Sequence, residues 1–450
     1  MTLLGVKVAA ARGVGVLSRR AGRGGTSLPG RLLLRMEPHA IGQLSARLPG
    51  GSSIISATNG KTTTAAMVAS ILGRGGVRLV HNRAGANMAG GVATALMDAE
   101  GDQGLFEVDE FWLDRVVPEL RPRAMLLANL FRDQLDRYGE IETIADRWAA
   151  VVAGFPGTAL VLNADDPLVA DLGRDRDGVL YFGVDDDSVA LEGMAHASDS
   201  KHCRQCGAPY VYDAVYLGHL GRYHCPNCHA SRPDLAVAAT RVVLDGTRGA
   251  DVTLRTPQGT VDVRIPLPGL YNVYNALAAA GLALTLGAPL ADVAAGLEAV
   301  EAAFGRAETL RLGDRELTLL LVKNPAGANE VLRTLTLDPG EHDLLGILND
   351  RTADGKDVSW VWDADFEVLA PRVRRATCSG TRAAEMALRL KYAGVDPDRL
   401  VVEPDLARAL DGATAPGAQR RVFALPTYTA MLALRDELVD RGAAQGSFAP

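Results

Sequence analysis

Short apolar runs alternate with stretches of helical periodicity along most of this chain of 450 residues. An apolar run begins at Ser52, and a helical pattern at 65–72 follows it after a tight glycine turn. Further strands are predicted at 77–81, 105–109, 124–129 and 159–163, and a helix is predicted at 88–98. Strands that alternate with helices indicate a parallel sheet with helices on both faces. Ligands of such a sheet are expected at the carboxyl ends of its strands.

The pattern changes in the second half of the chain. A cysteine module at about 200–230 interrupts it, a β-rich piece follows at 235–268, and helices are predicted at 275–286 and 290–303. Strands then alternate with helices again, at 317–322, 343–348, 366–369, 376–379 and 421–425. We therefore predict an α/β protein with a basic helical lead-in at 1–48, a central parallel-sheet domain at 49–304 and a C-terminal α/β domain at 305–450.

Composition and charge exclude some classes of protein. The net charge of −7 argues against a broad nucleic-acid surface, and the chain has no apolar run long enough to predict a transmembrane helix. The segment Met1 to Arg23 is basic and mildly apolar, but charges and glycines interrupt it. We interpret it as a short amphipathic helix rather than a signal peptide, with a solvated basic face favoured over membrane contact. The predicted location is cytoplasmic, and peripheral contact with the inner face of the membrane is left open.

The turn after the first strand has the composition of a phosphate-binding loop. It reads Thr58-Asn59-Gly60-Lys61-Thr62-Thr63 and leads directly into a helix. A helix N-terminus offers unpaired N–H groups and a partial positive charge to an anion. Lys61 would reach terminal phosphates and the Thr62 hydroxyl would face Mg²⁺. The strict GxxxxGK[ST] spacing is not met, because Ile55 stands where a glycine is required. The alternative is an ordinary strand-to-helix turn.

The cysteine module has the spacing of a structural zinc site. Cys203-x-x-Cys206 and Cys225-x-x-Cys228 form two knuckles that can place four thiolates tetrahedrally around Zn²⁺. Four thiolates close the coordination shell, so the predicted role is structural rather than catalytic. The use of cysteine also fits a reducing compartment better than a disulfide framework. The sequence thus predicts a zinc-ribbon insertion inside the central domain.

Two further acidic segments are candidate functional sites. Glu107 and Asp109 lie at the end of the strand predicted at 105–109, and we favour Glu107 as a magnesium ligand over a helix-capping role. The loop at 349–360 carries Asp350, Asp354 and Asp357. It could bind a metal, orient a histidine or form a simple polar turn. Cys378, the cysteine outside the module, has no base readable near it and is interpreted as buried and structural.

These motifs resemble the superfamily of Mur ligases and folylpolyglutamate synthases. The resemblance rests on Ala57–Thr64, Tyr271–Ala279 and Gly305–Glu308. Within that superfamily the four cysteines, the run Lys323–Gly327 and the 349–360 loop, which continues to residue 367, are similar to the MurT family of synthetase subunits of lipid II isoglutaminyl synthase. In one departure, Ala57 stands where the family commonly has glycine. Alanine is small enough that nucleotide binding should survive.

The resemblance implies a Mur ligase-like fold and a reaction. It implies ATP-dependent amidation of the D-glutamate α-carboxylate in the lipid II stem peptide, through an acyl phosphate. Ammonia would come from a GatD-like glutamine amidotransferase that forms a heterodimer with this chain. Asp357 matches the aspartate with which the synthetase subunit of this family would complete a catalytic triad with the partner's Cys and His. Matching positions assign the following residues to ATP: Thr58, Asn59, Gly60, Lys61, Thr62, Thr63, Glu107, Asn275 and Arg306. Thr62 and Glu107 are also assigned to Mg²⁺.

Two other functions stay open on the sequence alone. One is a stand-alone Mur-type amino-acid ligase or folylpolyglutamate synthase-like ligase. Ligases of nucleotide-linked muropeptides usually carry a further N-terminal domain, and the roughly fifty residues before the loop are too few for one. The other is a non-catalytic zinc-ribbon scaffold. That alternative predicts loss of the nucleotide site, whereas Lys61, Thr62 and Glu107 are all present.

Overall fold

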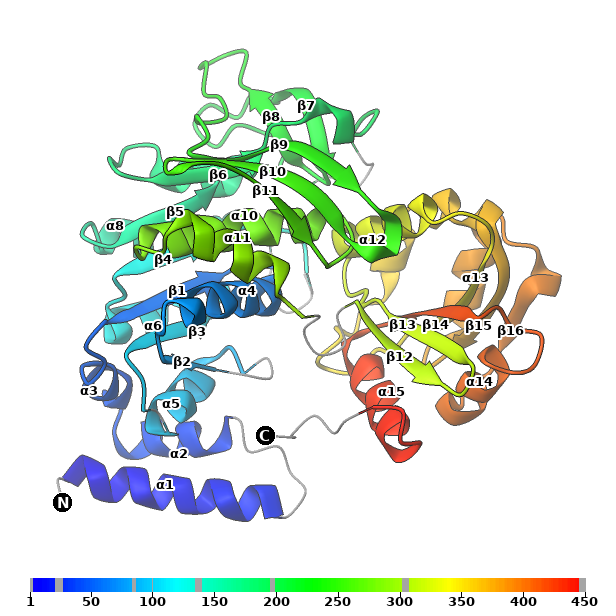
Figure 1. Cartoon of the computed structure of the whole chain (residues 1–450), viewed down its shortest axis with the longest axis horizontal. Coiled ribbons are helices and arrows are strands. Elements are labelled where there is room, and N and C mark those ends of the chain that lie inside the picture. Colours follow the sequence, from blue (N-terminus) through cyan, green and yellow to red (C-terminus); the bar gives the residue numbers. More distant parts are fainter. Residues whose placement is uncertain are drawn as a thin grey trace.

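The computed structural model describes residues 3–20, 27–82, 86–98, 100–133, 140–194, 199–301 and 307–444. Figure 1 shows a large sheet with its helices, a small hairpin at the top and a separate C-terminal sheet. Within the described residues no helix is long and apolar enough to span a bilayer.

The central domain is built on a mainly parallel sheet. Among the described residues its strand order is β11-β10-β9-β6-β5-β4-β1-β3-β2. The parallel strands are β1 (Ser52–Ser56), β2 (Leu79–His81), β3 (Gln103–Glu107), β4 (Ala124–Leu127), β5 (Ala159–Asn163), β6 (Leu180–Val184) and β9 (Val237–Leu244). The antiparallel strands β10 (Ala250–Thr256) and β11 (Gly259–Ile265) extend one edge.

Both faces of this sheet are buried under helices, as the apolar runs predict. On β1, Ile54 faces one core and its neighbour Ile55 faces the other, because side chains alternate along a strand. The first core lies under α2 (Leu28–Met36), α3 (Ala40–Ser45), α5 (Ala89–Asp98), α6 (Leu113–Leu120), α8 (Ile141–Gly154) and α9 (Pro167–Ala170). The second lies under α4 (Lys61–Arg74), α10 (Leu270–Thr285) and α11 (Leu290–Glu298).

The N-terminal segment is helical, as predicted, and packs on the first core. Helix α1 (Leu3–Arg20) buries Val8 and Ala11 there. Over residues 3–17 its outward face is apolar except for Arg12 at its edge, which differs from the solvated basic face that we favoured from the sequence. Lys7 is half-buried and pairs with Glu37 at 2.9 Å, and the Arg12 guanidinium donates to the Met97 carbonyl. Both cations therefore interact with the body of the domain.

The C-terminal domain holds a second sheet with helices on both faces. In the described residues its strand order is β12-β13-β17-β14-β15-β16, with β12 antiparallel to β13. The strands are β12 (Glu308–Leu312), β13 (Arg315–Leu319), β14 (His342–Ile347), β15 (Val373–Ser379), β16 (Leu400–Val402) and β17 (Arg421–Pro426). Helices α12 (Pro325–Leu337) and α13 (Ala383–Tyr392) cover one face, and α14 (Leu406–Ala413) and α15 (Tyr428–Asp440) cover the other.

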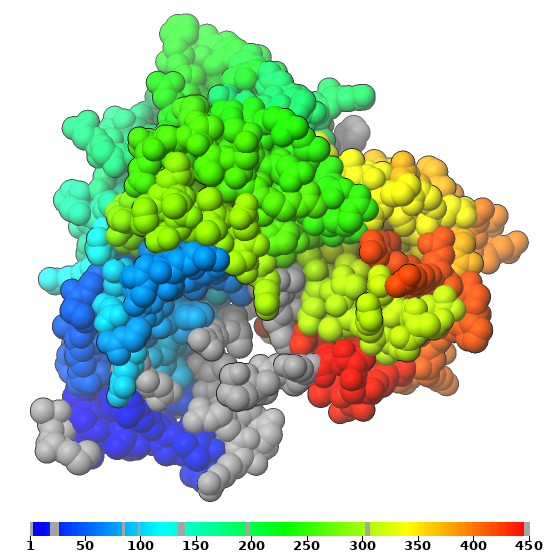
Figure 2. Space-filling model, viewed as in Figure 1, coloured from blue at the N-terminus to red at the C-terminus, as the bar shows by residue number. Residues whose placement is uncertain are grey.

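The two domains contact each other beside the large sheet. Arg333 on α12 donates to the carbonyl oxygens of Tyr216 at 3.0 Å and Val189 at 2.7 Å, and Asp338 accepts hydrogen bonds from Thr247. Figure 2 shows the yellow surface of the C-terminal domain meeting the green surface of the central domain. These contacts hold α12 against the site described below.

One predicted strand is wrong. Residues 366–369 form no strand, and Phe366–Val368 is a turn of 3-10 helix, η5. Two features explain this. Asn329 and Asp365 exchange hydrogen bonds of 3.1 and 2.7 Å, which tie the segment to α12. Pro371 lies shortly after, in another 3-10 turn, and it has no N–H to give to a sheet. The other predicted strands are present with ends shifted by a few residues.

Candidate functional sites

The phosphate loop links β1 to α4 through Gly60, a position where any side chain would be strained and would clash. Gly60 has φ of +88°, and a Cβ there would lie 2.0 Å from Asn275 Oδ1. Asn275 also accepts a hydrogen bond from Thr64 at 3.3 Å and donates to Asn272 at 3.0 Å. Asn275 therefore braces the loop from α10, in addition to lining the same cavity.

Two asparagines hold the loop at its centre. The Asn59 N–H donates to Asn129 Oδ1 at 2.9 Å, and Asn129 Nδ2 donates back to the Asn59 carbonyl at 3.0 Å. The Asn59 side chain also pairs with that of Asn324 in the C-terminal domain, at 3.1 and 3.4 Å. The Thr58 hydroxyl oxygen accepts a further hydrogen bond from the Phe131 N–H at 3.1 Å. The loop is thus fixed from both domains, with the N–H groups of α4 directed along the helix axis toward it.

Lys61 is the cation of this loop and is largely buried. Its Nζ lies 2.8 Å from Glu110 Oε2 and also donates to the Ala57 carbonyl. Burial would lower the pKa of Lys61, but the carboxylates of Glu110 and Asp109 outweigh it and the pKa is raised. Lys61 is therefore charged at any physiological pH.

Thr62 and Glu107 form a pair that suits a magnesium ion. Thr62 Oγ1 donates to Glu107 Oε2 at 2.9 Å, and Glu107 is buried. Neighbouring ligands of an octahedral Mg²⁺ lie about 2.9 Å apart when each metal–oxygen distance is near 2.0–2.1 Å. A hydroxyl and a carboxylate are also the hard oxygen ligands that Mg²⁺ prefers. The two residues present fit the predicted metal.

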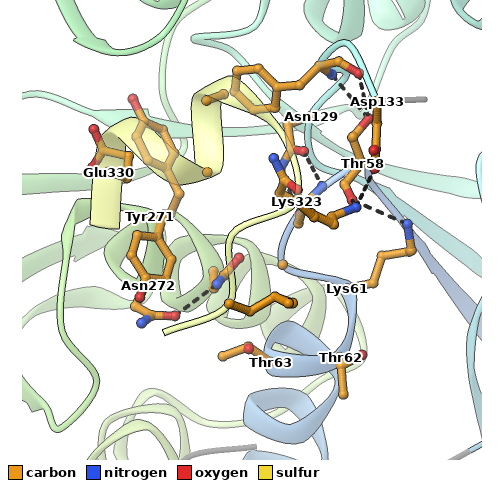
Figure 3. A pocket seen from close by; sticks show the side chains of 18 of the residues that line it. Thr58, Lys61, Thr62, Thr63, Asn129, Asp133, Tyr271, Asn272, Lys323 and Glu330 are labelled. Carbon is orange, nitrogen blue, oxygen red and sulfur yellow. Dashed lines mark hydrogen bonds and ion pairs between the residues drawn. The ribbon is translucent and has the colours of Figure 1, made fainter. Parts of the chain in front are cut away.

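The loop faces a cavity of about 340 Å³ between the two domains, which is within the usual range for ligand pockets. The C-terminal domain contributes Lys323, whose Nζ donates to the Thr58 carbonyl at 3.2 Å and pairs with Asp133. Lys61 Nζ lies 3.5 Å from that same carbonyl oxygen. Figure 3 shows the two lysines converging there from different elements. Two ammonium groups held so close together favour a polyanionic ligand.

The opposite end of the cavity is more aromatic. Tyr271 and Asn272 of α10 lie there, and Figure 3 shows Glu330 of α12 on the same side, away from Lys61. Glu330 is buried, and its Oε2 has no hydrogen-bond partner among the residues that the structure describes. Burial raises the pKa of Glu330 to about 7, although Arg333 lowers it. Such a carboxyl can accept a hydrogen bond from an amino group of a bound ligand.

The cysteine module forms a compact four-thiol cluster. The Sγ atoms of Cys203, Cys206, Cys225 and Cys228 all lie within 4.8 Å of one another. A Zn–S distance of about 2.3 Å implies sulfur–sulfur separations of roughly 3.8 Å in a tetrahedron. The hairpin of β7 (Val211–Leu217) and β8 (Leu220–His224) joins the knuckles, and its Leu217 and Leu220 line the cavity above. The cluster is compatible with zinc.

The two knuckles have matching backbones. Gly207 donates its N–H to the Cys203 carbonyl at 2.8 Å, and His229 donates to the Cys225 carbonyl at 3.0 Å. Both donors have left-handed backbone, with φ of +75° and +61°. Each turn therefore folds its pair of thiols inward in the same way, which explains why the C-x-x-C spacing predicted the cluster correctly.

Comparison with known proteins identifies the family. The MurT ligase C-terminal model matches residues 321–431, and the Mur ligase middle domain model matches 55–232. Lipid II isoglutaminyl synthase (glutamine-hydrolyzing) subunit MurT of Streptococcus pneumoniae is 34% identical over 433 residues, which is 95% of this chain and 94% of that protein. The chain belongs to the MurT family. It is accordingly an ATP-dependent ligase.

Solved structures confirm the predicted Mur ligase fold. The pseudomurein peptide ligase type C of Methanothermus fervidus superposes with a TM-score of 0.69 at 21% identity, covering 89% of this chain and 80% of that one. Folylpolyglutamate synthase of Mycobacterium tuberculosis, solved with ADP and AMPPCP, gives 0.62 at 18% identity, covering 91% and 98%. Both structures share the fold of this chain.

Apart from the four cysteines, the predicted site residues of this MurT-family chain fall into three groups. One cavity is lined by Thr58, Asn59, Gly60, Lys61, Thr62, Thr63, Glu107 and Asn275. Arg306 lies outside the described residues. Asp357 does not line the cavity, although Ala353 of the same loop does. Their assignments to ATP, Mg²⁺ and the partner remain proposals.

At the phosphate end of the cavity, sequence reasoning gave no role to Glu110 and Lys323, and it left the charged loop at 131–137, which contains Asp133, open between a functional role and a salt-bridged helix start. Glu110, the partner of Lys61, follows the acids Glu107 and Asp109, and this dense acidic run was the available signal. Asp133, the partner of Lys323, comes just after the buried strand β4. Nothing in the sequence indicates which lysine each acid would meet.

We expect zinc in one equivalent per chain, in a structural role. Cys203→Ser should lower the melting temperature by an amount on the order of 5 °C and reduce the soluble yield. Turnover of the surviving folded molecules should change much less, because the thiols are not in the cavity. The measurement is metal analysis of freshly purified protein, paired with thermal unfolding.

Cys378→Ser is the matched control for this experiment. Cys378 is fully buried on β15, away from the cluster, so its replacement should leave the zinc content unchanged. Metal-free wild-type protein, or equal zinc in both variants, would contradict the assignment.

Proposed function

We propose that this chain is the synthetase subunit of a lipid II isoglutaminyl synthase. In this reaction an oxygen of the D-glutamate α-carboxylate in the stem peptide attacks the γ-phosphorus of ATP, and ADP leaves. The nitrogen of ammonia then attacks the acyl carbon, and phosphate leaves to give D-isoglutamine. The first step is needed because a carboxylate is a poor electrophile and an acyl phosphate is a good one. ATP supplies the phosphoryl group, and Mg²⁺ would neutralise the negative charge of the phosphates.

The observation that carries this proposal is the cavity between the domains of a MurT-family chain. Lys61 and Lys323 reach one carbonyl oxygen from different domains. Each is charge-balanced by an acid, Glu110 or Asp133, so both stay in place before a ligand arrives. We assign to them the positioning of the phosphates, since phosphoryl transfer depends on positioning and charge stabilisation. Gly60 and Asn275 keep the loop in shape.

We also propose that the ammonia comes from a separate glutamine amidotransferase that forms a heterodimer with this chain. Outside the zinc cluster the sequence has one cysteine, Cys378. Its side chain is fully buried in β15, and burial raises its thiol pKa to about 12, so it is a poor nucleophile. Glutamine hydrolysis therefore needs a nucleophile from elsewhere. Asp357 is the residue that we assign to the joint glutaminase site.

The test is reconstitution with lipid II, ATP and the co-expressed amidotransferase. Glutamine carrying heavy nitrogen in its side-chain amide should deliver the label to the α-carboxamide of the second stem residue. A heavy-oxygen label in the D-glutamate α-carboxylate should appear in the released phosphate, because that oxygen stays with phosphorus when nitrogen displaces it. Transfer of an amino acid instead of ammonia would replace this proposal with a stand-alone ligase. ATP binding without any turnover would favour a scaffold.

A further inference from the structure

Over residues 3–17, helix α1 has an outward face that is apolar except for Arg12 at its edge. Its inner side packs Val8 and Ala11 into the first core of the central domain. Arg12 is exposed at one edge and donates to the Met97 carbonyl of α5. The other exposed positions are Leu3, Val6, Ala9, Ala10, Gly13, Val16 and Leu17.

This face differs from that of an ordinary surface helix. Helices of soluble domains place polar and charged residues on the side that faces water. Here the larger side chains are well exposed, with Leu3 at 73%, Val6 at 52%, Val16 at 42% and Leu17 at 66%. The small residues Ala9, Ala10 and Gly13 lie between them at helical spacing, so the exposed positions form one continuous stripe along the helix. A continuous exposed apolar stripe marks an interaction surface, whereas scattered apolar residues do not.

The charge around the stripe indicates what kind of surface it meets. Residues 1–36 contain no aspartate or glutamate, although the chain as a whole has a net charge of −7. Over the same stretch the basic residues are Lys7, Arg12, Arg19, Arg20, Arg23, Arg31 and Arg35. Arg31 and Arg35 are exposed on α2, the helix that packs beside α1. Over residues 1–36 the stripe is accompanied by cations and by no acid, and Glu37, the next acid along the chain, is paired with Lys7. An apolar stripe with this excess of cations is complementary to an anionic lipid surface.

We propose that α1 is a membrane-docking helix that lies in the interface of an anionic bilayer, with its apolar stripe in the acyl boundary. Figures 1 and 2 show α1 along the lower edge of the molecule, on the outer side of α2. The helix is tied to the domain by the Lys7–Glu37 ion pair and by Arg12, so docking orients the whole enzyme.

The orientation that docking gives to the enzyme bears on how a lipid-linked substrate reaches the cavity, and this part of the inference rests on the proposed function. Helix α2 lies against α5, where Gly30 approaches Gly90 so closely that a Cβ on Gly30 would lie 1.9 Å from the Gly90 carbonyl oxygen. The chain just before α5 supplies Asn87 and Met88 to the cavity wall. Docking by α1 therefore brings this side of the cavity toward the bilayer that would hold a lipid-linked substrate.

The test uses the full-length purified chain and vesicles without substrate, so that it does not depend on catalysis. Vesicles of phosphatidylglycerol and phosphatidylethanolamine are compared with vesicles of phosphatidylcholine alone, by co-sedimentation at low and high salt. Leu3→Glu and Leu17→Glu should each weaken binding to the anionic vesicles at least about tenfold. Leu337→Glu, at a leucine 45% exposed on the C-terminal domain, makes the same charge change elsewhere and should bind as wild type.

Several results would overturn the docking helix. One is failure of the wild-type protein to sediment with anionic vesicles, and another is binding of the Leu17→Glu variant to them as tightly as the wild type binds. The third such result is equal binding of the wild type to anionic and to neutral vesicles. If the stripe instead makes a contact between copies of the chain, Leu17→Glu will change the oligomeric state measured by light scattering without vesicles. Matched melting temperatures of the three variants check that each is folded.

A separate measurement distinguishes failure of docking from failure of the proposed function. Amidation of a water-soluble, short-chain lipid II analogue should be unchanged in Leu3→Glu and Leu17→Glu, while amidation of lipid II in vesicles falls. Loss of both activities would place α1 in a structural role and contradict the proposal. Vesicle binding without any amidation would refute the function and leave the docking helix standing.

Discussion

Lys61→Ala is expected to lower ATP-dependent amidation at least about a thousandfold, with either glutamine or ammonium as the nitrogen source. Lys61 lies at the start of α4, where its Nζ can hold terminal phosphates together with the helix N-terminus. The side chain that replaces it carries no charge and is too short to reach. The measurement is the rate of amide formation, with nucleotide binding followed by calorimetry on the same samples.

The buried partner of Lys61 has to be controlled in this experiment. Lys61 and Glu110 are an ion pair with little exposure on either side, so removing the lysine leaves a buried carboxylate uncompensated. The combined variant Lys61→Ala with Glu110→Gln removes that charge. We expect it to regain the wild-type melting temperature and to stay inactive. Near-normal turnover in either variant would refute the assignment of Lys61 to the nucleotide site. If the double variant regains both its melting temperature and its activity, Lys61 only supports the fold.

The sequence predicted best those features that depend on local pattern. Strand β5 was predicted with the bounds that the structure has, because its first four residues form an isolated apolar run that ends at Asn163. The four cysteines were predicted as one cluster because each C-x-x-C turn folds its thiols inward by itself. The loop at Gly60 was recognised because a left-handed turn before a helix needs glycine.

Features that depend on contacts between distant segments could not be predicted. The Lys323–Thr58 and Asn324–Asn59 bonds join different domains, and no periodicity in the sequence records which pairs will meet. The same limit applies to α1: its pattern predicts a helix, but only packing decides which face is covered. There the buried side is the one that contains Val8 and Ala11, and the apolar stripe is left outside. The strand prediction at 366–369 was wrong for a related reason, because the apolar residues of this segment pack as 3-10 turns against α12 and α13.

The second large effect is expected at Asp357, and the three acids of its loop differ in availability. Asp354 is buried and accepts two hydrogen bonds from Thr429. Asp350 accepts from Thr381 at 2.9 Å and pairs with Arg382 at 3.0 Å. Asp357 is exposed, and among the described residues no cation pairs with it. Of the three acids, Asp357 therefore fits best the proposed contact with a histidine of the partner.

Asp357 also has the charge state that this role requires. Its Oδ1 accepts the Ser359 N–H at 2.8 Å, and this hydrogen bond lowers the carboxyl pKa. The side chain is thus ionised at neutral pH, with its second oxygen available. An aspartate behind a histidine fixes the tautomer and stabilises the imidazolium, and its loss from a triad costs about 10⁴-fold in serine proteases. The proposed glutaminase role of Asp357 would use this mechanism across a subunit interface.

Asp357→Asn is therefore expected to reduce glutamine-driven amidation by up to about 10⁴-fold while the ATP site stays folded. The asparagine keeps the size of the side chain and its oxygen for Ser359, so the loop should hold its shape. Ammonium at high concentration should restore the product, because phosphorylation of the carboxylate needs no glutaminase. If ammonium fails to rescue, Asp357 acts in the synthetase site instead. Full glutamine-dependent activity would pass the role to Asp350 or Asp354, each tested by the same substitution, or remove it from this subunit.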